Sequence, residues 1–459
     1  MSVSAFTARR RRSASRAVAA PREWSGLRPR DIWIAITAVG IVLFAMWLRH
    51  GGPGLDPLTA FGQVSALGGT YAALLGVLFA SRAPWLDQVM GSDRLRAIHG
   101  VLGFVAVWAI GAHALTSTLA AGGGSPARFL PTLGEFLATV PGMLGAVVGM
   151  ALLAVVGALS TRFARRRMSY ERWHGIHLYV YLAVVLGYLH QLTIGSDFVD
   201  DPLAAAFWIG LYVVAFTPLV LHRILWPIVT TIRHRPRVRS VVREADGVFS
   251  LYVVGRDLDR LAARSGQFFV VRALTWADWT HGHPFSISAA PRGDWLRFTI
   301  KILGEGTRAL AGLAPGTRLA LEGPYGSVHG ARRTGRPLLL IGGGIGIAPI
   351  RALAESLGFR PGEADLIYRV RDGGDAALRA ELEALAARRG IRLHVLASRR
   401  ADRAVGSDPL SPDRIRQLVP DAAQRDIFLC GPEGLMERTR AALLALGAAP
   451  QRIHLEQFG

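Results

Sequence analysis

Four histidines in apolar segments carry the clearest chemical signal in this sequence. His99 and His113 lie in one hydrophobic segment, and His177 and His190 lie in another. An ionisable side chain is costly inside a bilayer, so two spaced pairs indicate a chemical role, and haem ligation is the best candidate. Fourteen residues of helix cover roughly 21 Å, which suits one haem near each face of an apolar layer about 30 Å thick.

The second pair is spaced less regularly than the first. Fourteen residues return to within roughly 40° of the same face of an ideal helix, whereas the thirteen residues from His177 to His190 miss by roughly 140°. We therefore expect the helix that carries His177 to tilt, bulge or kink. His174 lies three residues before His177 and is an alternative to it as the haem ligand.

The apolar segments that must hold these histidines end near residue 228, and ordinary globular sequence follows. Six segments are long and apolar enough to cross a bilayer. They lie at roughly 31–49, 58–81, 95–121, 136–161, 173–194 and 203–228. The sequence thus predicts a six-helix transmembrane bundle, with a soluble half after it.

Arginine is distributed unevenly among the segments that flank these spans. It is dense in the N-terminal tail and in the loops after the second and fourth spans, whereas the opposite loops hold little more than Arg128. By the positive-inside rule, both termini are cytoplasmic, and we expect residues 1–30 to be a disordered tail of a protein in the cell membrane. His99 and His177 then lie toward the cytoplasm, and His113 and His190 lie toward the outside.

Charge and cysteine content exclude several classes of partner and cofactor. The net charge is +20, but the arginines flank the spans and are not interleaved with aromatic residues, which favours a membrane surface over nucleic acid. Cys430 is the only cysteine. An internal disulfide, a four-cysteine iron–sulfur cluster and a covalently attached haem are therefore excluded, and any haem must be held by histidine alone.

The soluble half begins, after a basic linker at 233–239, with short strands and turns that continue to about residue 330, as in a small antiparallel β-barrel. Within it, proline keeps the preceding residue extended, and Ser286 can present its hydroxyl to a flavin. The alternative for this stretch is an ordinary buried strand. Glycines and a hydroxyl follow where backbone amides can hold a pyrophosphate. The residues concerned are His283, Pro284, Phe285, Ser286, Ile287 and Ser288, followed by Gly304, Gly306 and Thr307.

From about residue 336, strands alternate with helices, which predicts an α/β domain with a parallel sheet. A buried strand runs into a glycine-rich loop whose backbone can approach a dinucleotide diphosphate at the start of a helix. The loop contains Gly342, Gly343, Gly344, Gly346 and Pro349. It is not the Gly-x-Gly-x-x-Gly fingerprint, because Pro349 takes the final place.

Two later strands end in residues that suit a nicotinamide nucleotide. Ser398 and Arg399 can bind the 2′-phosphate that distinguishes NADPH from NADH, helped by Arg369 or Arg371, so NADPH is favoured although NADH is possible. Another strand runs through Cys430 into Gly431 and Pro432, which can bring a small thiol beside the nicotinamide. A buried cysteine without a chemical role is the alternative.

In this order, the motifs resemble those of the ferric reductase and NADPH oxidase superfamily in its bacterial form. The resemblance runs from residue 31 to the end, and the soluble half is similar to ferredoxin–NADP reductases. It implies that FAD binds to the hexapeptide His283–Ser288 and to Gly304, Gly306 and Thr307. It also implies that NADPH lies over 342–349, Ser398, Arg399 and Cys430. It also implies two b-type haems, one between His99 and His177 and one between His113 and His190. Phe458 would stack on the flavin, although here Gly459 follows it.

We therefore expect a six-span haem domain at 31–228, an FAD-binding β-barrel domain at 233–332 and an NAD(P)H-binding α/β domain at 333–459. The resemblance implies an NAD(P)H-dependent flavohaem oxidoreductase that passes electrons from cytoplasmic NADPH to an acceptor on the outer face. The implied acceptors are a ferric or cupric chelate, or oxygen giving superoxide. Two alternatives stay open. One is a membrane-anchored flavin reductase serving a soluble carrier, and the other is an electron-transfer subunit for an outer-face protein or a quinone.

Overall fold

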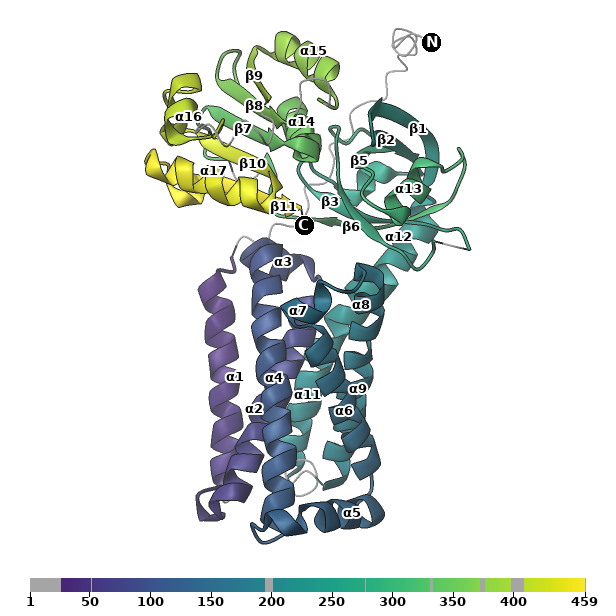
Figure 1. Cartoon of the computed structure of the whole chain (residues 1–459), viewed down its shortest axis with the longest axis vertical. Helices are drawn as coiled ribbons and strands as arrows, with labels where there is room; N and C mark the ends of the chain where they lie inside the picture. Colours follow the sequence, from purple (N-terminus) through teal and green to yellow (C-terminus); the bar gives the residue numbers. More distant parts are fainter. Residues whose placement is uncertain are drawn as a thin grey trace.

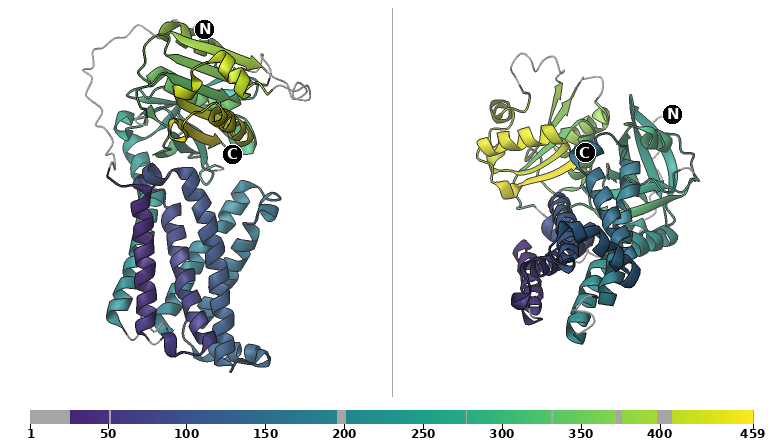
Figure 2. Two further views of the ribbon diagram at one scale, coloured as in Figure 1. Left: turned by 90° about the vertical axis from the view of Figure 1, so that its left-hand side faces the viewer. Right: turned by 60° about the horizontal axis from the view of Figure 1, so that its bottom comes forward.

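The computed structural model describes residues 26–50, 52–194, 201–276, 278–330, 333–371, 376–397 and 408–458. The chain folds into a bundle of long helices with a soluble half on one end (Figure 1), and Figure 2 shows the helices running side by side beneath it. The first helix begins at the end of the bundle that carries the soluble half (Figure 1).

The bundle is built from long apolar helices whose large side chains are widely exposed, as expected for surfaces that contact lipid. These helices are α1 (Pro29–Arg49), α2 (Pro57–Ala80), α4 (Ser92–Ala121), α6 (Met143–Leu159), α9 (Tyr179–Ile194) and α11 (Pro202–Leu219). Shorter segments are α3 (Pro84–Met90), α5 (Phe129–Thr139), α7 (Arg162–Arg165), α8 (Tyr170–His177), the π-helical turn Val220–Leu225 and α12 (Trp226–His234).

Within the described ranges, five helical stretches are long and apolar enough to cross a membrane, so the chain is a multi-pass membrane protein. They are Pro29–Arg49, Pro57–Ala80, Arg94–Ala121, Arg172–Thr193 and Pro202–His234. α6 is apolar but has only 17 residues. The sixth span therefore stays a prediction.

The expected irregularity beside His177 is confirmed, because the helix is interrupted at Leu178, between α8 and α9. There, the backbone N–H of Tyr181 donates to the carbonyl of Leu178, a three-residue step that winds the chain more tightly than an α-helix. The interruption therefore changes the angle between His177 and His190.

The soluble half begins with two antiparallel three-stranded sheets. The first has the order β1 (Arg237–Ala245), β2 (Val248–Val254), β5 (Trp295–Lys301), and the second has the order β4 (His283–Ser286), β3 (Phe268–Ala273), β6 (Leu319–Tyr325). A bridge between Ile287 and Phe298 joins the sheets, and α13 (Glu305–Ala311) follows β5. Phe269, Phe298 and Ile287 are fully buried in a shared core. Closure of the two sheets into a barrel stays a prediction.

The predicted α/β fold is confirmed in the last part of the chain. Its parallel sheet has the order β11 (Ile453–Phe458), β10 (Asp426–Pro432), β7 (Leu338–Gly343), β8 (Ala364–Val370), β9 (Ile391–Ala397). Because side chains alternate along a strand, β7 packs Leu340 on one face and Ile341 on the other. The first face is covered by α14 (Ile347–Ser356) and α15 (Arg379–Arg389), and the second by α16 (Pro412–Leu418) and α17 (Glu433–Ala445).

A buried carboxylate stabilises this sheet at the amino end of β8. Asp365 is fully buried and contacts Arg392 at 2.6 Å, Arg425 at 2.8 Å and His394 at 3.0 Å. Burial alone would raise the pKa of Asp365, but hydrogen bonds from Arg392 and His394 and the charge of Arg425 outweigh it and hold the pKa below its ordinary value of 3.8.

We expect Asp365→Asn to lower the free energy of unfolding by about 3–5 kcal/mol at neutral pH, because it removes the buried carboxylate beside Arg425 and leaves that buried guanidinium with only the half-exposed Asp421 as its counter-charge. Because the pKa is lower in the folded state, the contribution of this carboxylate is complete above the unfolded pKa and lost as pH falls below about 4. Thermal unfolding of the full chain in detergent, at several pH values, should show the gap between wild type and variant narrowing in acid. Asp246→Asn, which removes an exposed carboxylate near Arg243, should change nothing, and equal losses in both variants would contradict the argument.

Candidate functional site

One cavity of about 2550 Å³ connects the helical half to both parts of the soluble half. Predicted site residues from all three regions line it: His99, His177, His283, Pro284, Phe285, Ser286, Gly304, Gly306, Thr307, Gly343, Gly344, Pro349, Gly431 and Pro432. Ile287, Ser288, Gly342, Gly346, Cys430, His113 and His190 do not line it. Ser398, Arg399 and the side chain of Phe458 lie outside the described residues.

His99 and His177 face each other where the cavity enters the helices. Their ring centroids are 5.9 Å apart, with the rings inclined at 75°. The Nδ1 of His99 lies 3.0 Å from the carbonyl oxygen of Gly76. Because a carbonyl only accepts, Nδ1 carries the proton and donates it, which leaves Nε2 as a free metal ligand. The gap accommodates a metal ion with bonds of about 2 Å to each ring, so the pair fits a haem iron.

The ring of His113, fourteen residues further along α4, is held by a carbonyl of α2 in the same way as the ring of His99. Its Nδ1 donates to the carbonyl of Gly62 at 3.0 Å, and Ser117 Oγ lies 3.2 Å from the same nitrogen. His190 lies on α9, and its buried Nδ1 has no hydrogen-bond partner among the described residues. Among the described residues, a hydrogen bond to Nδ1 thus orients the ring of His113 but not the ring of His190.

Three glycines of α2, which sequence reasoning missed, allow these contacts. Gly62, Gly69 and Gly76 recur every seven residues and face α4. A Cβ at Gly62 would lie 2.7 Å from Ser117 Oγ, and one at Gly69 would lie 2.8 Å from Ile110. The two helices therefore pack closely, and the fourteen-residue step from Gly62 to Gly76 matches the step between the two histidines of α4. Glycines at steps of seven in the preceding span were the available signal.

Trp173 and Ser160, which the sequence analysis also missed, surround His177. The Trp173 ring stacks on the His177 ring at 5.0 Å and 24°. The hydroxyl of Ser160 lies 3.4 Å from His177 Nδ1 and accepts a hydrogen bond from Trp173 Nε1 at 3.3 Å. The ring of His174 contacts Trp173, whereas the ring of His177 contacts His99. This arrangement favours His177 over His174 as the inner ligand.

The two serines of the hexapeptide His283–Ser288 lie in different environments. Ser286, at the end of β4, is 5% exposed, lines the cavity, and its hydroxyl has no hydrogen-bond partner in the described part of the chain. Ser288 instead accepts hydrogen bonds from Arg297 Nε at 3.1 Å and Thr299 Oγ1 at 2.8 Å. A buried, unsatisfied hydroxyl in a cavity wall fits a polar ligand such as the flavin ring.

The loop before α13 brings its backbone against the same strand. A Cβ at Gly306 would collide with the imidazole of His283, so only glycine allows this approach. The hydroxyl of Thr307 accepts hydrogen bonds from the backbone N–H groups of Leu303 and Gly304, at 2.9 and 3.1 Å, which fixes the start of α13. The predicted pyrophosphate residues therefore form one wall of the cavity beside β4.

The carboxyl ends of β7, β8 and β10 form the opposite wall of the cavity. A Cβ at Gly346 would collide with the carbonyl oxygen of Cys430, so the glycine-rich turn packs directly on β10. Burial raises the pKa of the Cys430 thiol, and its Sγ donates to the carbonyl of Glu456 at 3.3 Å. The thiol thus lies against β11, and its role beside a nicotinamide stays a prediction. Arg369 and Arg371, at the end of β8, line the cavity where a nucleotide phosphate would lie.

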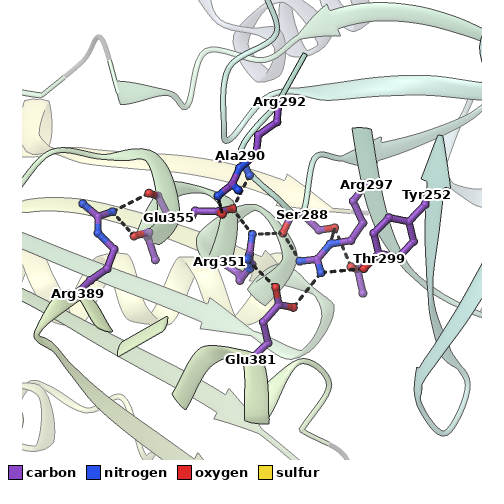
Figure 3. A network of polar contacts seen from close by, with 11 residues as sticks. Tyr252, Ser288, Ala290, Arg292, Arg297, Thr299, Arg351, Glu355, Glu381 and Arg389 are labelled. Carbon is purple, nitrogen blue, oxygen red and sulfur yellow. Dashed lines mark hydrogen bonds and ion pairs between the residues drawn. The ribbon is translucent and has the colours of Figure 1, made fainter. Parts of the chain in front are cut away.

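A partly buried ionic network joins the two parts of the soluble half (Figure 3). Glu381 contacts Arg297 of β5 at 2.9 Å and Arg351 of α14 at 2.6 Å. Glu355 pairs with Arg351 and Arg292, and it accepts a hydrogen bond from the backbone N–H of Ala290 at 2.8 Å. Both sides of the cavity are therefore held in one orientation by charges that are costly to separate.

Fold and site together define a multi-pass membrane protein with a nucleotide-binding reductase half. Residues 66–188 match the family of ferric reductase like transmembrane components, and residues 340–441 match the oxidoreductase NAD-binding domain family. The two matched regions together match the architecture of the ferric reductase and NADPH oxidase superfamily, and the soluble half is similar to NAD(P)H-dependent oxidoreductases.

Individual relatives match about half of the chain. A flavohemoprotein of Chromobacterium violaceum is 32% identical over 245 residues, and an NADPH oxidoreductase of Mycobacterium tuberculosis is 30% identical over 234 residues. Each match covers 49% of this chain and 60% of the relative. The solved FAD/NAD-binding domain of nitric oxide dioxygenase from Vibrio cholerae is 22% identical, with a TM-score of 0.40, and the match covers 50% of this chain and 99% of that one.

Proposed function

We propose that the protein passes electrons from cytoplasmic NADPH, through FAD and two b-type haems, to an acceptor on the outer face of the cell membrane. The observation that carries the proposal is the single cavity that connects the nucleotide loop, the flavin strand and the inner histidine pair. Its lining brings together predicted site residues from positions 99 to 432 of the chain, and residues with unrelated structural roles would not need to share one cavity.

The proposed sites follow from this cavity. FAD would lie along His283–Ser288 and against Gly304, Gly306 and Thr307, and NADPH would lie over the glycine-rich loop, Ser398, Arg399, Gly431 and Pro432. Phe458 would cover the flavin until nicotinamide replaces it. A flavin accepts a hydride and releases electrons singly, which converts two-electron chemistry into the one-electron chemistry of haem. We assign a six-span haem domain to 31–228, an FAD-binding barrel to 233–332 and an NAD(P)H domain to 333–459.

In this scheme the protein's own groups orient the cofactors. Ser286 would donate a hydrogen bond to the flavin edge, and the glycine carbonyls of α2 would keep Nε2 of His99 and His113 directed at iron. The pairs His99 with His177 and His113 with His190 would give each iron two protein ligands. Oxygen would then have to react at a haem edge, because both axial positions are taken. The proposed acceptors are a ferric or cupric chelate, or oxygen giving superoxide.

The distribution of arginine supports a cytoplasmic position for both termini and the soluble half. The segments that join α2 to α4 and α6 to α8 lie at the end of the bundle that bears the soluble half, and they carry Arg82, Arg162 and Arg165. Arg94 and Arg96 follow in the first turns of α4. NADPH is a cytoplasmic metabolite, so this orientation places the nucleotide site where its substrate is, and the outer pair next to an external acceptor.

An anaerobic visible spectrum of the detergent-purified chain, with flavin and haem quantified before and after NADPH is added, tests the proposal. We expect two b-type haems and one FAD per chain, all reduced by NADPH. Reduction of flavin in a protein without haem would replace the proposal with a membrane-anchored flavin reductase that serves a soluble carrier.

A further inference from the structure

A buried carboxylate joins the soluble half to the helices. Glu322, on β6, is 2% exposed and is surrounded by three arginines. Arg82 follows α2 and lies 3.1 Å from it, Arg223 of the π-helical turn lies 3.5 Å away, and Arg272 of β3 lies 3.3 Å away. Two of these cations thus come from the helical half, and the carboxylate and the third cation come from the soluble half.

Tyr325 reinforces the same junction. Its hydroxyl donates to Glu322 at 3.1 Å, and the guanidinium of Arg82 lies over its ring at 4.9 Å. Burial raises the pKa of Tyr325, so the hydroxyl stays protonated and donates to the carboxylate. One residue further on, the backbone N–H of Gly326 donates to Asp87 of α3 at 3.2 Å. The end of β6 therefore contacts the helices at two neighbouring points.

The junction lies between the flavin strand and the inner histidine pair. Arg82, Arg223 and Tyr325 line the same cavity as Ser286, His99 and His177. Movement at Glu322 would therefore change the distance between the flavin site and the inner pair.

We propose that Glu322 is the positioning residue that holds the reductase half against the helices, and thereby sets the gap that electrons cross. The proposal rests on the proposed function. Its physical basis is electrostatic, because the carboxylate makes the interaction between the charged groups of the two halves attractive by binding cations from both. With a neutral side chain at this position, Arg82 and Arg223 would instead repel Arg272 across the junction.

Only one of the two redox stages crosses this junction. NADPH is oxidised to NADP⁺ when it transfers a hydride to the flavin, and this stage lies within the soluble half. The two electrons would then leave singly, each reducing one ferric iron to ferrous iron, while the flavin would release to water the one proton that arrived as hydride. A loosened junction should therefore slow haem reduction and leave flavin reduction unchanged.

The test is stopped-flow reduction of full-length Glu322→Gln by NADPH without oxygen. We expect flavin bleaching within about twofold of wild type, and haem reduction slowed at least about tenfold, because misplacement by about 1 Å can cost about 100-fold in rate. Flavin and haem contents should be unchanged. Amide hydrogen exchange should increase in 81–90 and 319–326, a readout that does not depend on turnover.

Two further variants keep the test decisive if Glu322→Gln folds poorly. Arg82→Gln leaves Glu322 with Arg223 and Arg272, and it should slow haem reduction less while sparing flavin reduction. Adding Arg82→Gln to Glu322→Gln removes one repelling cation, so the double variant should be less impaired than the two single effects predict. Asp246→Asn removes an exposed carboxylate of the same domain and should behave as wild type.

Haem reduction at the wild-type rate in both Glu322→Gln and Arg82→Gln, with unchanged exchange, would overturn the proposal. Equal slowing of flavin and haem reduction would also overturn it, because the effect would then lie within the soluble half. If wild-type protein holds no haem that NADPH reduces, the proposed function is wrong, and hydrogen exchange alone decides whether Glu322 holds the two halves together.

Discussion

Replacing His177 with alanine is expected to reduce the haem content from two per chain to one and to stop NADPH-dependent reduction of the haem that remains. The ring of His177 faces His99 at a centroid distance of 5.9 Å, so its loss leaves the inner iron with one protein ligand. The outer pair lies fourteen residues, roughly 21 Å, further along α4 from the soluble half, so electrons from the flavin should reach the inner site first. Flavin reduction should continue, because it takes place in the soluble half.

His174→Ala is the matched control, because it removes an imidazole three residues away on the same helix. The ring of His174 contacts Trp173 rather than His99, so this variant should keep both haems and their reduction by NADPH. Haem quantification and anaerobic spectra distinguish the two variants. Loss of a haem from His174→Ala, with both haems kept in His177→Ala, would assign the inner ligand to His174.

Replacing Ser286 with alanine is expected to slow flavin reduction by NADPH by about 100-fold, the usual effect of removing one hydrogen-bond donor from a reacting group. The Ser286 hydroxyl is buried in the cavity wall and has no partner within the described chain, so a bound flavin is the group that would satisfy it. Stopped-flow bleaching of the flavin measures this step directly, before any electron reaches haem. The flavin content should stay near that of wild type, because the rest of the strand and the loop at Gly304 are unchanged.

Ser250→Ala is the control for loss of a buried hydroxyl. Ser250 lies on β2 of the same domain and bonds Thr299 at 2.9 Å, but it does not line the cavity. This variant should bleach within about twofold of wild type. A normal rate in Ser286→Ala would contradict the role assigned to its hydroxyl, and a protein without flavin would indicate binding rather than hydride transfer.

These variants act at successive points of the proposed path. Ser286→Ala affects the entry of the hydride, Glu322→Gln affects the crossing from the soluble half, and His177→Ala removes the first acceptor in the membrane. Ser286→Ala should leave the flavin oxidised, whereas Glu322→Gln and His177→Ala should leave haem oxidised and differ in haem content, so the absorbance of flavin and haem identifies the step that fails.

The amino-acid sequence by itself determined the parts of this protein that depend on local patterns. A bilayer requires long apolar helices, so five of the six predicted spans could be recognised from composition, and ionisable groups are rare there, so the four histidines stood out. The strands and glycine-rich loop of the nucleotide domain were readable because alternation and turn chemistry extend over only a few residues. Even the break beside His177 followed from the mismatch between thirteen residues and the helical repeat.

The tertiary structure alone decided which residues meet. Glu322 meets Arg82, which lies 240 positions earlier in the chain, and Arg297 meets Glu381 across 84 positions. Periodicity shows which face of an element is buried, but it does not show which other element covers that face. For the same reason, only the folded chain separated Ser286, whose buried hydroxyl has no partner among the described residues, from Ser288, which is bonded to Arg297. Long-range partners follow from packing in three dimensions, and no local pattern in the chain encodes them.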